Sequence, residues 1–465
     1  MGMETSRHAA HQDMPAKFLL ILAVILISVL YVSLIFNQNI WTDEAFTIDL
    51  VSNNTIYGII SGTANDVHPP LYYLIAKVFV SMFGSGFQVY KIVSIVPVAL
   101  TMFLSVIYIR PWFGTKTALL FLLFFNAIPS VMEYGVQIRM YSWSIFFITA
   151  AGLSAYGAYT EDGIKHWYIL SLSALCACYT HNFAMISAVW IYVLLGASLI
   201  MRKKSVPVRW LLSGMLVGIC FIPWLFVLLR QTSLRVDNYW IEPITANTIM
   251  GYFSDLYGSR LPFTTVMFAI LLIAAVVSGN CRCEIKYYSI LLLLIPLLTT
   301  LVGVLVSVLI TPFFIARYLI PCMGLVALAL AIGFGRDKSI SFGLLCVFLV
   351  VMIGNSYYTN YIDEYCSTHT DELLDYLDEN LTEKDIILYN NQLYGYIYAC
   401  YFDKDMLCFL DEMDFNTDYE TIWYFDSCIS PWLPDTVLAE HGLTKEYIAT
   451  TGIEQNDFIL YKIHK

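Results

Sequence analysis

The sequence predicts a polytopic α-helical membrane protein of about eleven spans, followed by a small α/β domain. Three observations lead to this fold class. The 465 residues are 58% hydrophobic and only 13% charged, which is about half the charged share of an ordinary soluble domain. Long runs without any charge alternate with short charged segments, as in chains that cross a bilayer repeatedly. The last hundred or so residues instead have the mixed helix and strand patterns of a soluble domain.

The charge-free runs define the predicted spans. A crossing needs about 20 apolar residues. The first run has no small-residue cleavage site, so we interpret it as a retained span and not as a signal peptide. Residues 1–16 are then the N-terminus before the membrane, and residues 17–362 are the membrane domain. The predicted spans are 18–36, 92–109, 117–132, 141–160, 167–180, 183–201, 211–229, 261–280, 287–310, 318–335 and 340–361.

Positive charge orients the bundle. With the N-terminus in the cytoplasm, the predicted inner segments contain 13 of the 20 Lys and Arg residues that precede residue 363. The protein is therefore expected in the cell membrane with its N-terminus cytoplasmic. The loops 37–91, 133–140 and 230–260 and the domain 363–465 are expected on the extracytoplasmic side.

Two extracytoplasmic segments have predicted structure of their own. In loop 37–91, "HPPLYYLIAKVFVSMF" predicts an interfacial helix with Pro69 or Pro70 at its start. In domain 363–465, "TDELLDYLDENL" predicts a helix, whereas "DIILYN", "TIWYFD" and "DFILYKI" predict strands. We therefore expect an α/β domain large enough to fold by itself.

The net charge of −11 comes from this last domain, which holds 22 of the 36 acidic residues and only 5 of the 25 basic ones. Its sign argues against nucleic-acid partners. The eleven cysteines have no metal-ligand spacing. Disulfides are compatible with an extracytoplasmic domain, and the sequence leaves open how they would pair Cys366, Cys400, Cys408 and Cys428.

Polar residues that are unusual in a membrane protein lie almost entirely on the predicted outer side. Charges near membrane depth are costly and usually face a cavity within the bundle. Carboxylates and arginines that converge there predict a pocket for an anionic substrate beside a general base. The residues are Asp43, Glu44, Asp66, His68, Glu133, Arg139, His181, Arg230, Arg235, Asp255, Arg260 and Arg317.

Each of these residues alone also has a purely structural explanation. Asp43 and Glu44 could belong to a solvated loop, and Asp66 could cap the following helix. Interfacial anchoring, burial in the core or extension to lipid headgroups would equally account for Glu133, Arg139, His181 and Arg317. We prefer the shared pocket, because otherwise separate explanations would have to coincide on one side of the membrane.

The motifs "WTDEAFT", "DVHPPLYYLIAK", "EYGVQIRMYSW", "YTHNF" and "RYLIPCMGLVALA" occur in an order that resembles bacterial membrane glycosyltransferases of the GT-C type. These are relatives of the dolichyl-phosphate-mannose-protein mannosyltransferases and of the lipid A aminoarabinose transferase. The resemblance covers roughly residues 17–335. It implies a hexosyl- or pentosyltransferase with a polyprenyl-phosphate sugar donor and an acceptor hydroxyl on the extracytoplasmic side. The sugar stays open, as does the acceptor, which could be a lipid, a protein or a cell-wall glycan.

The resemblance also implies roles for individual residues. The catalytic set would be Asp43, Glu44 and Asp66, with Asp43 as the general base of an inverting displacement. Metal dependence differs among members, so a divalent metal on Asp43, Asp66 and His68 stays open. The expected donor-phosphate ligands are Arg139, Arg317, His181 and Tyr318, and the expected remainder of the pocket is His68, Glu133 and Tyr141.

Two other functions are compatible with the sequence. One is a transporter or flippase of a lipid-linked sugar precursor, which typically has inverted repeats and charges at the centres of its spans. The predicted spans contain no such charges, and the sequence has no evident internal repeat. The other is a surface-polysaccharide ligase or polymerase, which would use the same outer pocket with an oligosaccharide donor.

Overall fold

The computed structural model describes residues 2–36, 40–234, 241–258, 262–277, 283–335, 341–359, 370–454 and 456–464. Its contacts divide the chain into two compact units. The first unit contains Met1–Ile35 and Thr55–Tyr358, and the second contains Phe36–Asn54 and Thr359–Lys465. Part of the predicted loop 37–91 therefore packs with the C-terminal region.

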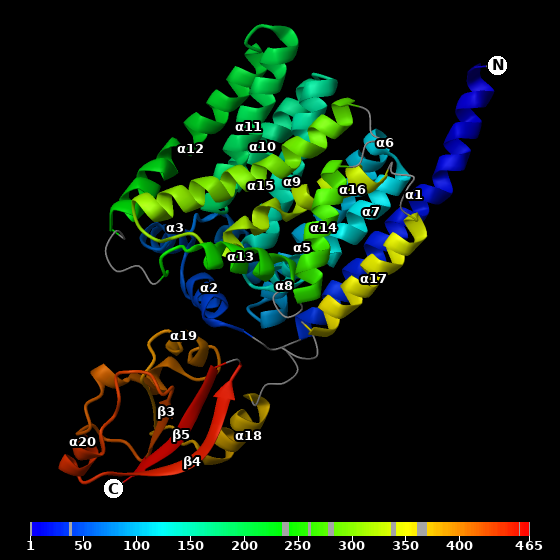
Figure 1. Cartoon of the computed structure of the whole chain (residues 1–465). Helices are drawn as coiled ribbons and strands as arrows, with labels where there is room; N and C mark the ends of the chain where they lie inside the picture. Colours follow the sequence, from blue (N-terminus) through cyan, green and yellow to red (C-terminus); the bar gives the residue numbers. More distant parts are fainter. Residues whose placement is uncertain are drawn as a thin grey trace. The chain divides into compact units, whose positions relative to one another are not determined.

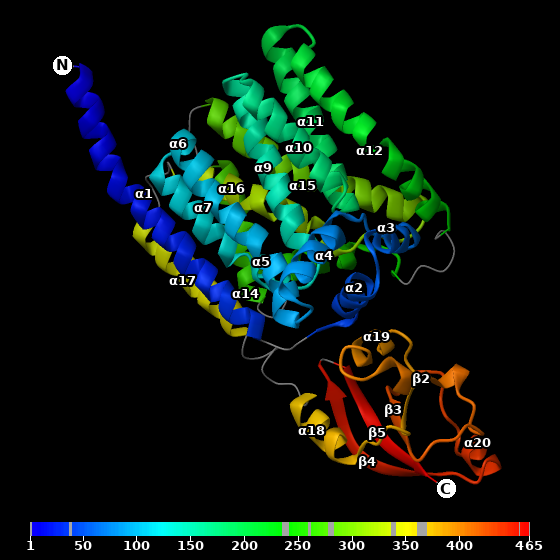
Figure 2. The same cartoon turned by 180° about the vertical axis from the view of Figure 1, so that it is seen from behind.

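The first unit is a bundle of helices that run past one another in both directions (Figures 1 and 2). Its longer helices are α1 (Gly2–Ser33), α5 (Phe87–Leu104), α7 (Thr115–Ala127), α9 (Tyr141–Thr160), α10 (Ile164–Cys178), α11 (Asn182–Lys203), α12 (Val208–Leu234), α14 (Pro262–Val277), α15 (Cys283–Leu309), α16 (Met323–Gly335) and α17 (Phe342–Tyr358). Shorter elements connect them: α3 (Ile56–Asn65), α4 (Leu71–Phe83), the π-helical turn Ser105–Ile109, α6 (Arg110–Phe113), α8 (Pro129–Val136), α13 (Ala246–Tyr257) and the 3₁₀ helix η3 (Ala316–Cys322).

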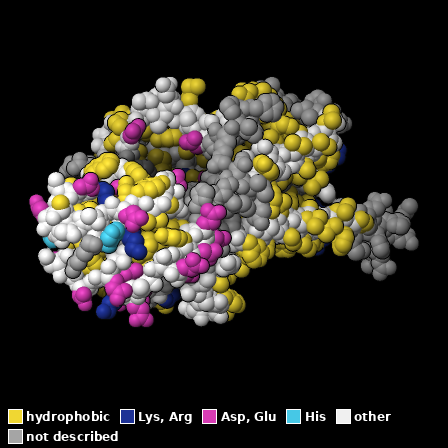
Figure 3. Space-filling view, turned by 90° about the horizontal axis from the view of Figure 1, so that it is seen from below, with side chains coloured by type: hydrophobic (Ala, Val, Ile, Leu, Met, Phe, Trp, Pro, Cys, Tyr) yellow, Lys and Arg dark blue, Asp and Glu magenta, His cyan; other side chains and the backbone are white. Residues whose placement is uncertain are grey.

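Several of these helices have the length and composition of membrane spans. Within the described residues, six segments qualify, and the bent pair α7–α8 makes a seventh if it is one broken span. Outward-facing side chains of α1, such as Phe18 and Leu26, are more than 60% exposed and apolar. Figure 3 shows hydrophobic side chains along the surface of α1. The count of eleven crossings and the orientation of the termini stay predictions.

The predicted span 117–132 is wrong as a single helix. The chain bends by 71° between α7 and α8. Ile128, which precedes Pro129, is extended with a ψ of 112°, because a residue before proline is disfavoured in the helical region. Glu133 consequently lies in the short helix α8 and not in a loop.

The centre of the bundle is formed by α9, which packs against α5, α10, α11 and α16. Small residues allow the close approach of α9 and α16. At Gly324 on α16, an added Cβ would lie 1.9 Å from the Oγ1 atom of Thr149 on α9. A larger side chain at Gly324 would therefore separate the two helices.

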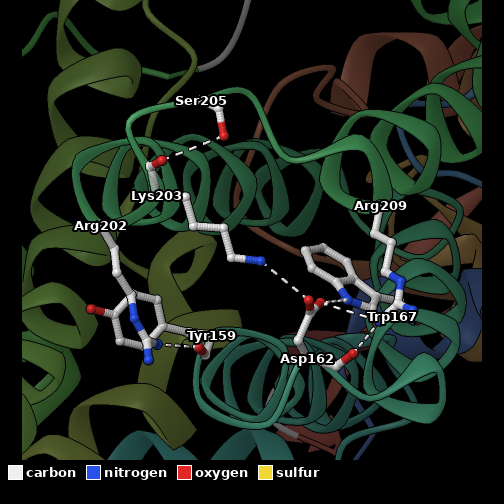
Figure 4. A network of polar contacts seen from close by, with 7 residues as sticks. All are labelled: Tyr159, Asp162, Trp167, Arg202, Lys203, Ser205 and Arg209. Carbon is white, nitrogen blue, oxygen red and sulfur yellow. Dashed lines mark hydrogen bonds and ion pairs between the residues drawn. The ribbon is translucent and has the colours of Figure 1, made fainter.

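One end of the bundle carries a polar network centred on Asp162, in the turn between α9 and α10 (Figure 4). The Asp162 carboxylate accepts a hydrogen bond of 2.9 Å from Trp167 Nε1. It also forms ion pairs with Lys203 at 3.2 Å and Arg209 at 3.5 Å. These contacts tie the α9–α10 turn to the turn between α11 and α12. We call this the Asp162 end.

The second unit contains a five-stranded sheet in the order β2-β1-β3-β5-β4. The strands are β1 (Ile386–Tyr389), β2 (Leu407–Phe409), β3 (Ile422–Asp426), β4 (Thr444–Ile453) and β5 (Asn456–His464). Strand β1 is parallel to β2 and β3, whereas β5 is antiparallel to β3 and β4. The helices are α18 (Thr370–Asn380), α19 (Gly395–Tyr398) and α20 (Asp435–Glu440). The predicted helix and the three predicted strands are confirmed, while β2 and β4 were not predicted.

Alternation along β3 gives the sheet two buried faces, as expected of a strand with side-chain period two. Ile422 and Tyr424 join one core cluster, which also includes Leu438 of α20. Trp423 contacts Tyr376 of α18, and Phe425 stacks on Phe458 at 4.4 Å. The C-terminal region is thus a separate domain with its own core.

The helix α2 (Thr42–Asn53) belongs to this second unit, although it follows the first span in the sequence. The sequence predicted a loop here. The carboxylate of Glu44 accepts a hydrogen bond of 3.1 Å from the backbone N–H of Trp41. A glutamate at the third helical position that bonds back to the residue before the helix stabilises the start of the helix.

Candidate functional site

A loop between α3 and α4 places His68 at the end of the bundle opposite the Asp162 end. Two hydrogen bonds hold this loop: Asn182 Nδ2 donates to the carbonyl of Val67 at 2.9 Å, and the N–H of Leu71 donates to the carbonyl of Tyr179 at 3.0 Å. Both partners come from the connection between α10 and α11. His68 is therefore fixed beside His181 and is only 7% exposed.

Asp66 lies two residues before His68 and ends α3. Its backbone N–H donates to the carbonyls of Gly62 at 3.0 Å and Thr63 at 3.2 Å. The alternative in which Asp66 caps the following helix is wrong, because the residue preceding α4 is Pro70. The half-buried Asp66 carboxylate is thus held near the His68 loop by the end of α3.

His181 lies at the centre of the site. It precedes α11 in extended conformation, and its Nδ1 atom accepts a hydrogen bond of 3.1 Å from the N–H of Phe183. A neutral imidazole that accepts at Nδ1 carries its proton on Nε2. The side chain is 1% exposed, and its Nε2 atom has no hydrogen-bond partner among the described residues. A buried donor of this kind is costly unless a ligand or water accepts its proton.

Aromatic rings from several elements surround His181. The ring of His68 stacks on it with centroids 5.5 Å apart. Tyr141 at the start of α9 lies at 5.7 Å, and Tyr318 of η3 lies at 5.4 Å. Phe183 packs on Tyr318 at 4.9 Å. The structure therefore brings together predicted residues that are up to 250 positions apart in the sequence.

Two arginines add positive charge to this cluster. Arg139 is 3% exposed, and its Nη1 atom donates to the hydroxyl of Tyr73 at 3.3 Å. Arg317 is half-buried in η3. Burial, together with the nearby guanidinium groups of Arg139 and Arg317, lowers the pKa of His181 to about 3. His181 is therefore neutral at physiological pH, while both arginines keep their charge.

Glu133 lies at the edge of the cluster, on α8. It is half-buried, and its neighbour Tyr134 contacts the ring of Tyr141 at 4.9 Å. Tyr134 is also within electrostatic reach of Arg317 and of Asp255 on α13. The sequence analysis thus named the charged residues of this cluster as candidates but missed Tyr73, Tyr134 and Phe183. An aromatic residue beside a span usually belongs to the hydrophobic core or anchors the helix at the membrane interface, so these three gave no signal of their own.

An apolar cavity of about 480 Å³ opens beside the histidines. Its polar lining includes His68, His181, Gln231 and Tyr318. Its other walls are apolar residues of α11, α12 and α15 and of the segment before η3, among them Ile186, Leu228, Val306 and Phe313. This combination suits an amphiphile with a polar head near the histidines and a hydrocarbon chain in the cavity.

The remaining candidates are placed differently. Asp43 and Glu44 lie in the first turn of α2, in the second unit. Asp43 is half-buried, whereas Glu44 is buried. Arg235 and Arg260 lie outside the described residues, and Arg230 reaches Asn65 at 3.5 Å.

The described residues contain neither a group of side chains that could hold a metal ion nor a disulfide between the cysteines of the C-terminal domain. Among them, no three His, Cys, Asp or Glu side chains lie close enough together to hold a metal ion. Cys400, Cys408 and Cys428 are free thiols in this part of the chain, so the disulfides that the sequence left open do not form between them. Cys366 lies outside the described residues.

Comparison with known proteins agrees with the motif resemblance. Residues 67–226 match the family model described as dolichyl-phosphate-mannose-protein mannosyltransferase. This range begins after Asp43 and ends before Arg317, and it is narrower than the range expected from the motifs. No curated protein sequence matches the chain significantly.

Among solved structures, ArnT from Cupriavidus metallidurans bound to undecaprenyl phosphate aligns with a TM-score of 0.61 at 11% identity. The alignment covers 95% of this chain and 97% of that chain. The apo state of the same protein gives a TM-score of 0.49 at 12% identity, over 96% and 98% of the two chains. The predicted fold class is therefore confirmed: the chain has an ArnT-like fold of apolar helices with a small C-terminal sheet domain.

Proposed function

We propose that this protein is a membrane glycosyltransferase that transfers a sugar from a polyprenyl-phosphate donor to an acceptor hydroxyl on the extracytoplasmic face. The observation that carries the proposal is the cluster of His68, Arg139, His181 and Arg317 beside an apolar cavity. The fold shared with ArnT, a protein solved with undecaprenyl phosphate, supports the same donor class.

The cluster supplies what a departing lipid phosphate needs. Arg139 and Arg317 stay charged, and a planar guanidinium binds phosphate oxygens through two parallel hydrogen bonds. The neutral His181 presents a buried Nε2–H donor, which a phosphate oxygen would satisfy. Donors that are fixed before the reaction stabilise developing charge most effectively.

In the proposed reaction, the Asp43 carboxylate removes the proton from the acceptor hydroxyl. The acceptor oxygen then forms a bond to the anomeric carbon, and the bond from that carbon to the phosphate oxygen breaks. The leaving group is the polyprenyl phosphate anion, held by Arg139, Arg317 and His181. One displacement of this kind inverts the anomeric centre.

The test uses the full-length protein in lipid nanodiscs with a radiolabelled polyprenyl-phosphate sugar. Asp43→Asn is expected to lower kcat by about 10²- to 10⁴-fold, the usual range for loss of a general base. Arg139→Ala is expected to lower kcat/KM for the lipid donor, because it removes a charge that stabilises the departing phosphate. The matched control is Asp378→Asn, an exposed carboxylate on α18 that should leave transfer unchanged.

Full transfer by the Asp43→Asn variant would rule out this residue as the base. The product mass separates the remaining alternatives, because a one-sugar transferase adds one sugar whereas a ligase or polymerase adds a block. Movement of labelled donor across the bilayer without any product would instead favour a transporter.

A further inference from the structure

We infer that the C-terminal domain positions α2, and with it Asp43, through Glu454 and Lys404. This inference rests on the proposed function, in which Asp43 is the general base. Both residues lie more than 350 positions after α2 in the sequence. They belong to the same compact unit as α2.

The first contact fixes the start of α2. Glu454, in the turn between β4 and β5, is 3% exposed. Its Oε2 atom accepts a hydrogen bond of 3.0 Å from the backbone N–H of Ile40, the residue before Trp41. Its Oε1 atom accepts a hydrogen bond from the hydroxyl of Tyr401. A buried carboxylate of the C-terminal domain is therefore used to hold the backbone that leads into α2.

Further contacts hold the body of the helix. Phe46 packs edge-to-face on Tyr396 of α19, with ring centroids 5.6 Å apart. One turn later, Asp49 forms an ion pair with Lys404. The sequence gives no sign of this partner, because Lys404 lies 355 positions after Asp49.

Cys400 lies beside the same contacts. Burial, together with the nearby carboxylates of Asp49 and Glu454, raises the pKa of its thiol to about 12. Acidic side chains of α2 and of the β4–β5 turn thus lie near the same thiol: Asp49, Glu44 and Glu454. The contacts at Ile40, Phe46 and Asp49 lie before and after Asp43, so a shift of the domain would move the carboxylate.

Loss of these contacts should affect kcat and the KM for the lipid donor differently. The proposed donor-phosphate residues belong to the first unit, whereas Glu454, Lys404 and α2 belong to the second. Loosening α2 should therefore lower kcat and leave the KM for the lipid donor unchanged. A displacement of about 1 Å can lower a rate by up to about 100-fold.

The experiment measures transfer kinetics and hydrogen–deuterium exchange of α2 amides in the full-length protein in nanodiscs. Glu454→Ala is expected to lower kcat by about tenfold or more and to speed exchange across α2. Lys404→Ala removes an exposed ion pair, and a smaller loss of about two- to threefold is expected. Glu454→Gln, which keeps a carbonyl acceptor for Ile40, should retain most of the activity.

The rescue variant and the control make the test specific. The charge-reversed pair Asp49→Lys with Lys404→Asp should recover the turnover that either single change loses. The matched control is Lys445→Ala, which breaks an ion pair with Asp435 inside the C-terminal domain, away from α2. It should change neither kcat nor the exchange of α2.

The inference would be overturned if the α2 amides exchange at the wild-type rate in both Glu454→Ala and Lys404→Ala. It would also be overturned if exchange becomes faster while kcat stays at the wild-type value. Asp43→Asn reports separately on the proposed function. If the Asp43→Asn variant keeps full activity, the assignment of Asp43 as the general base is wrong, even if the exchange data show that Glu454 holds α2.

Discussion

The imidazole rings of His68 and His181 stack with centroids 5.5 Å apart and planes 27° apart. Each histidine comes from a connection between helices, and the hydrogen bond from Asn182 to Val67 holds the two connections together. The pair forms part of the lining of the apolar cavity. In this geometry the Nε2 atom of His181 is buried without a hydrogen-bond partner among the described residues, which supports its proposed role as a donor to the lipid phosphate.

Loss of that donor should weaken catalysis without unfolding the protein. His181→Ala is expected to lower kcat/KM for the lipid donor by about 10- to 100-fold, because a hydrogen bond to a charged group contributes roughly 1.5–3 kcal/mol. Steady-state transfer assays measure the effect. His441→Ala, at an exposed histidine of the C-terminal domain, is the control and should be silent. A wild-type kcat/KM for His181→Ala would contradict the assigned role.

Buried, neutral His181 should also make stability depend on pH. Its pKa is about 3 in the folded protein, lowered from 6.5 mainly by burial. Between these values the unfolded chain binds the proton and the folded chain does not, so stability falls as the pH decreases from about 6.5 towards 3. In His181→Asn, which keeps a side-chain acceptor for the N–H of Phe183, the Tm should fall less between about pH 7.5 and pH 5 than in the wild type. Parallel Tm curves for the two proteins would contradict this assignment.

The structure brings several of the predicted site residues together, whereas the loops around them differ from the prediction. Long charge-free runs are unambiguous signals of apolar helices, and charged residues at their ends are unusual enough to be noticed. His68, Arg139, His181 and Arg317 therefore stand out as candidates in the sequence alone. Their meeting around one ring depended on helix packing, which no local pattern encodes.

The failures have identifiable physical causes. The break at Ile128 follows from Pro129, a signal that was present but was outweighed by the apolar composition of the run. The short helix α2 was missed because its carboxylates resemble those of a solvated loop. Its docking on Lys404 and Glu454 spans more than 350 residues, so neither periodicity nor capping could reveal it.

The Asp162 end should contribute to stability and not to transfer. A helix of 20 residues is about 30 Å long, and α9 separates the Asp162 turn from Tyr141 by this length. Asp162→Asn keeps an acceptor for Trp167 but loses the ion pairs with Lys203 and Arg209. Because the Asp162 side chain is 42% exposed, the free energy of unfolding should fall by less than about 1 kcal/mol.

Thermal unfolding at low and high salt tests this expectation. The difference between wild type and Asp162→Asn should shrink at about 1 M salt, where ion pairs are screened, and transfer activity should be unchanged. Asp162→Ala also removes the acceptor of Trp167 Nε1, so it should destabilise the protein more. If the Asp162→Asn variant is fully folded but transfers sugar more slowly, the Asp162 end and the end that carries His181 are coupled.

The apolar cavity should decide which lipid donors are accepted. Ile186 lines it from α11, and Ile186→Trp would fill part of the space that a polyprenyl chain is proposed to occupy. We expect kcat/KM for a long-chain donor to fall about tenfold, since each displaced methylene contributes about 0.8 kcal/mol. A short-chain donor, which leaves the cavity partly empty, should be affected much less. Val193→Trp is the matched control, because Val193 lies two turns further along α11 and faces a different groove. Equal losses for both donors, or a similar loss in Val193→Trp, would show that the cavity is not the site of the lipid chain.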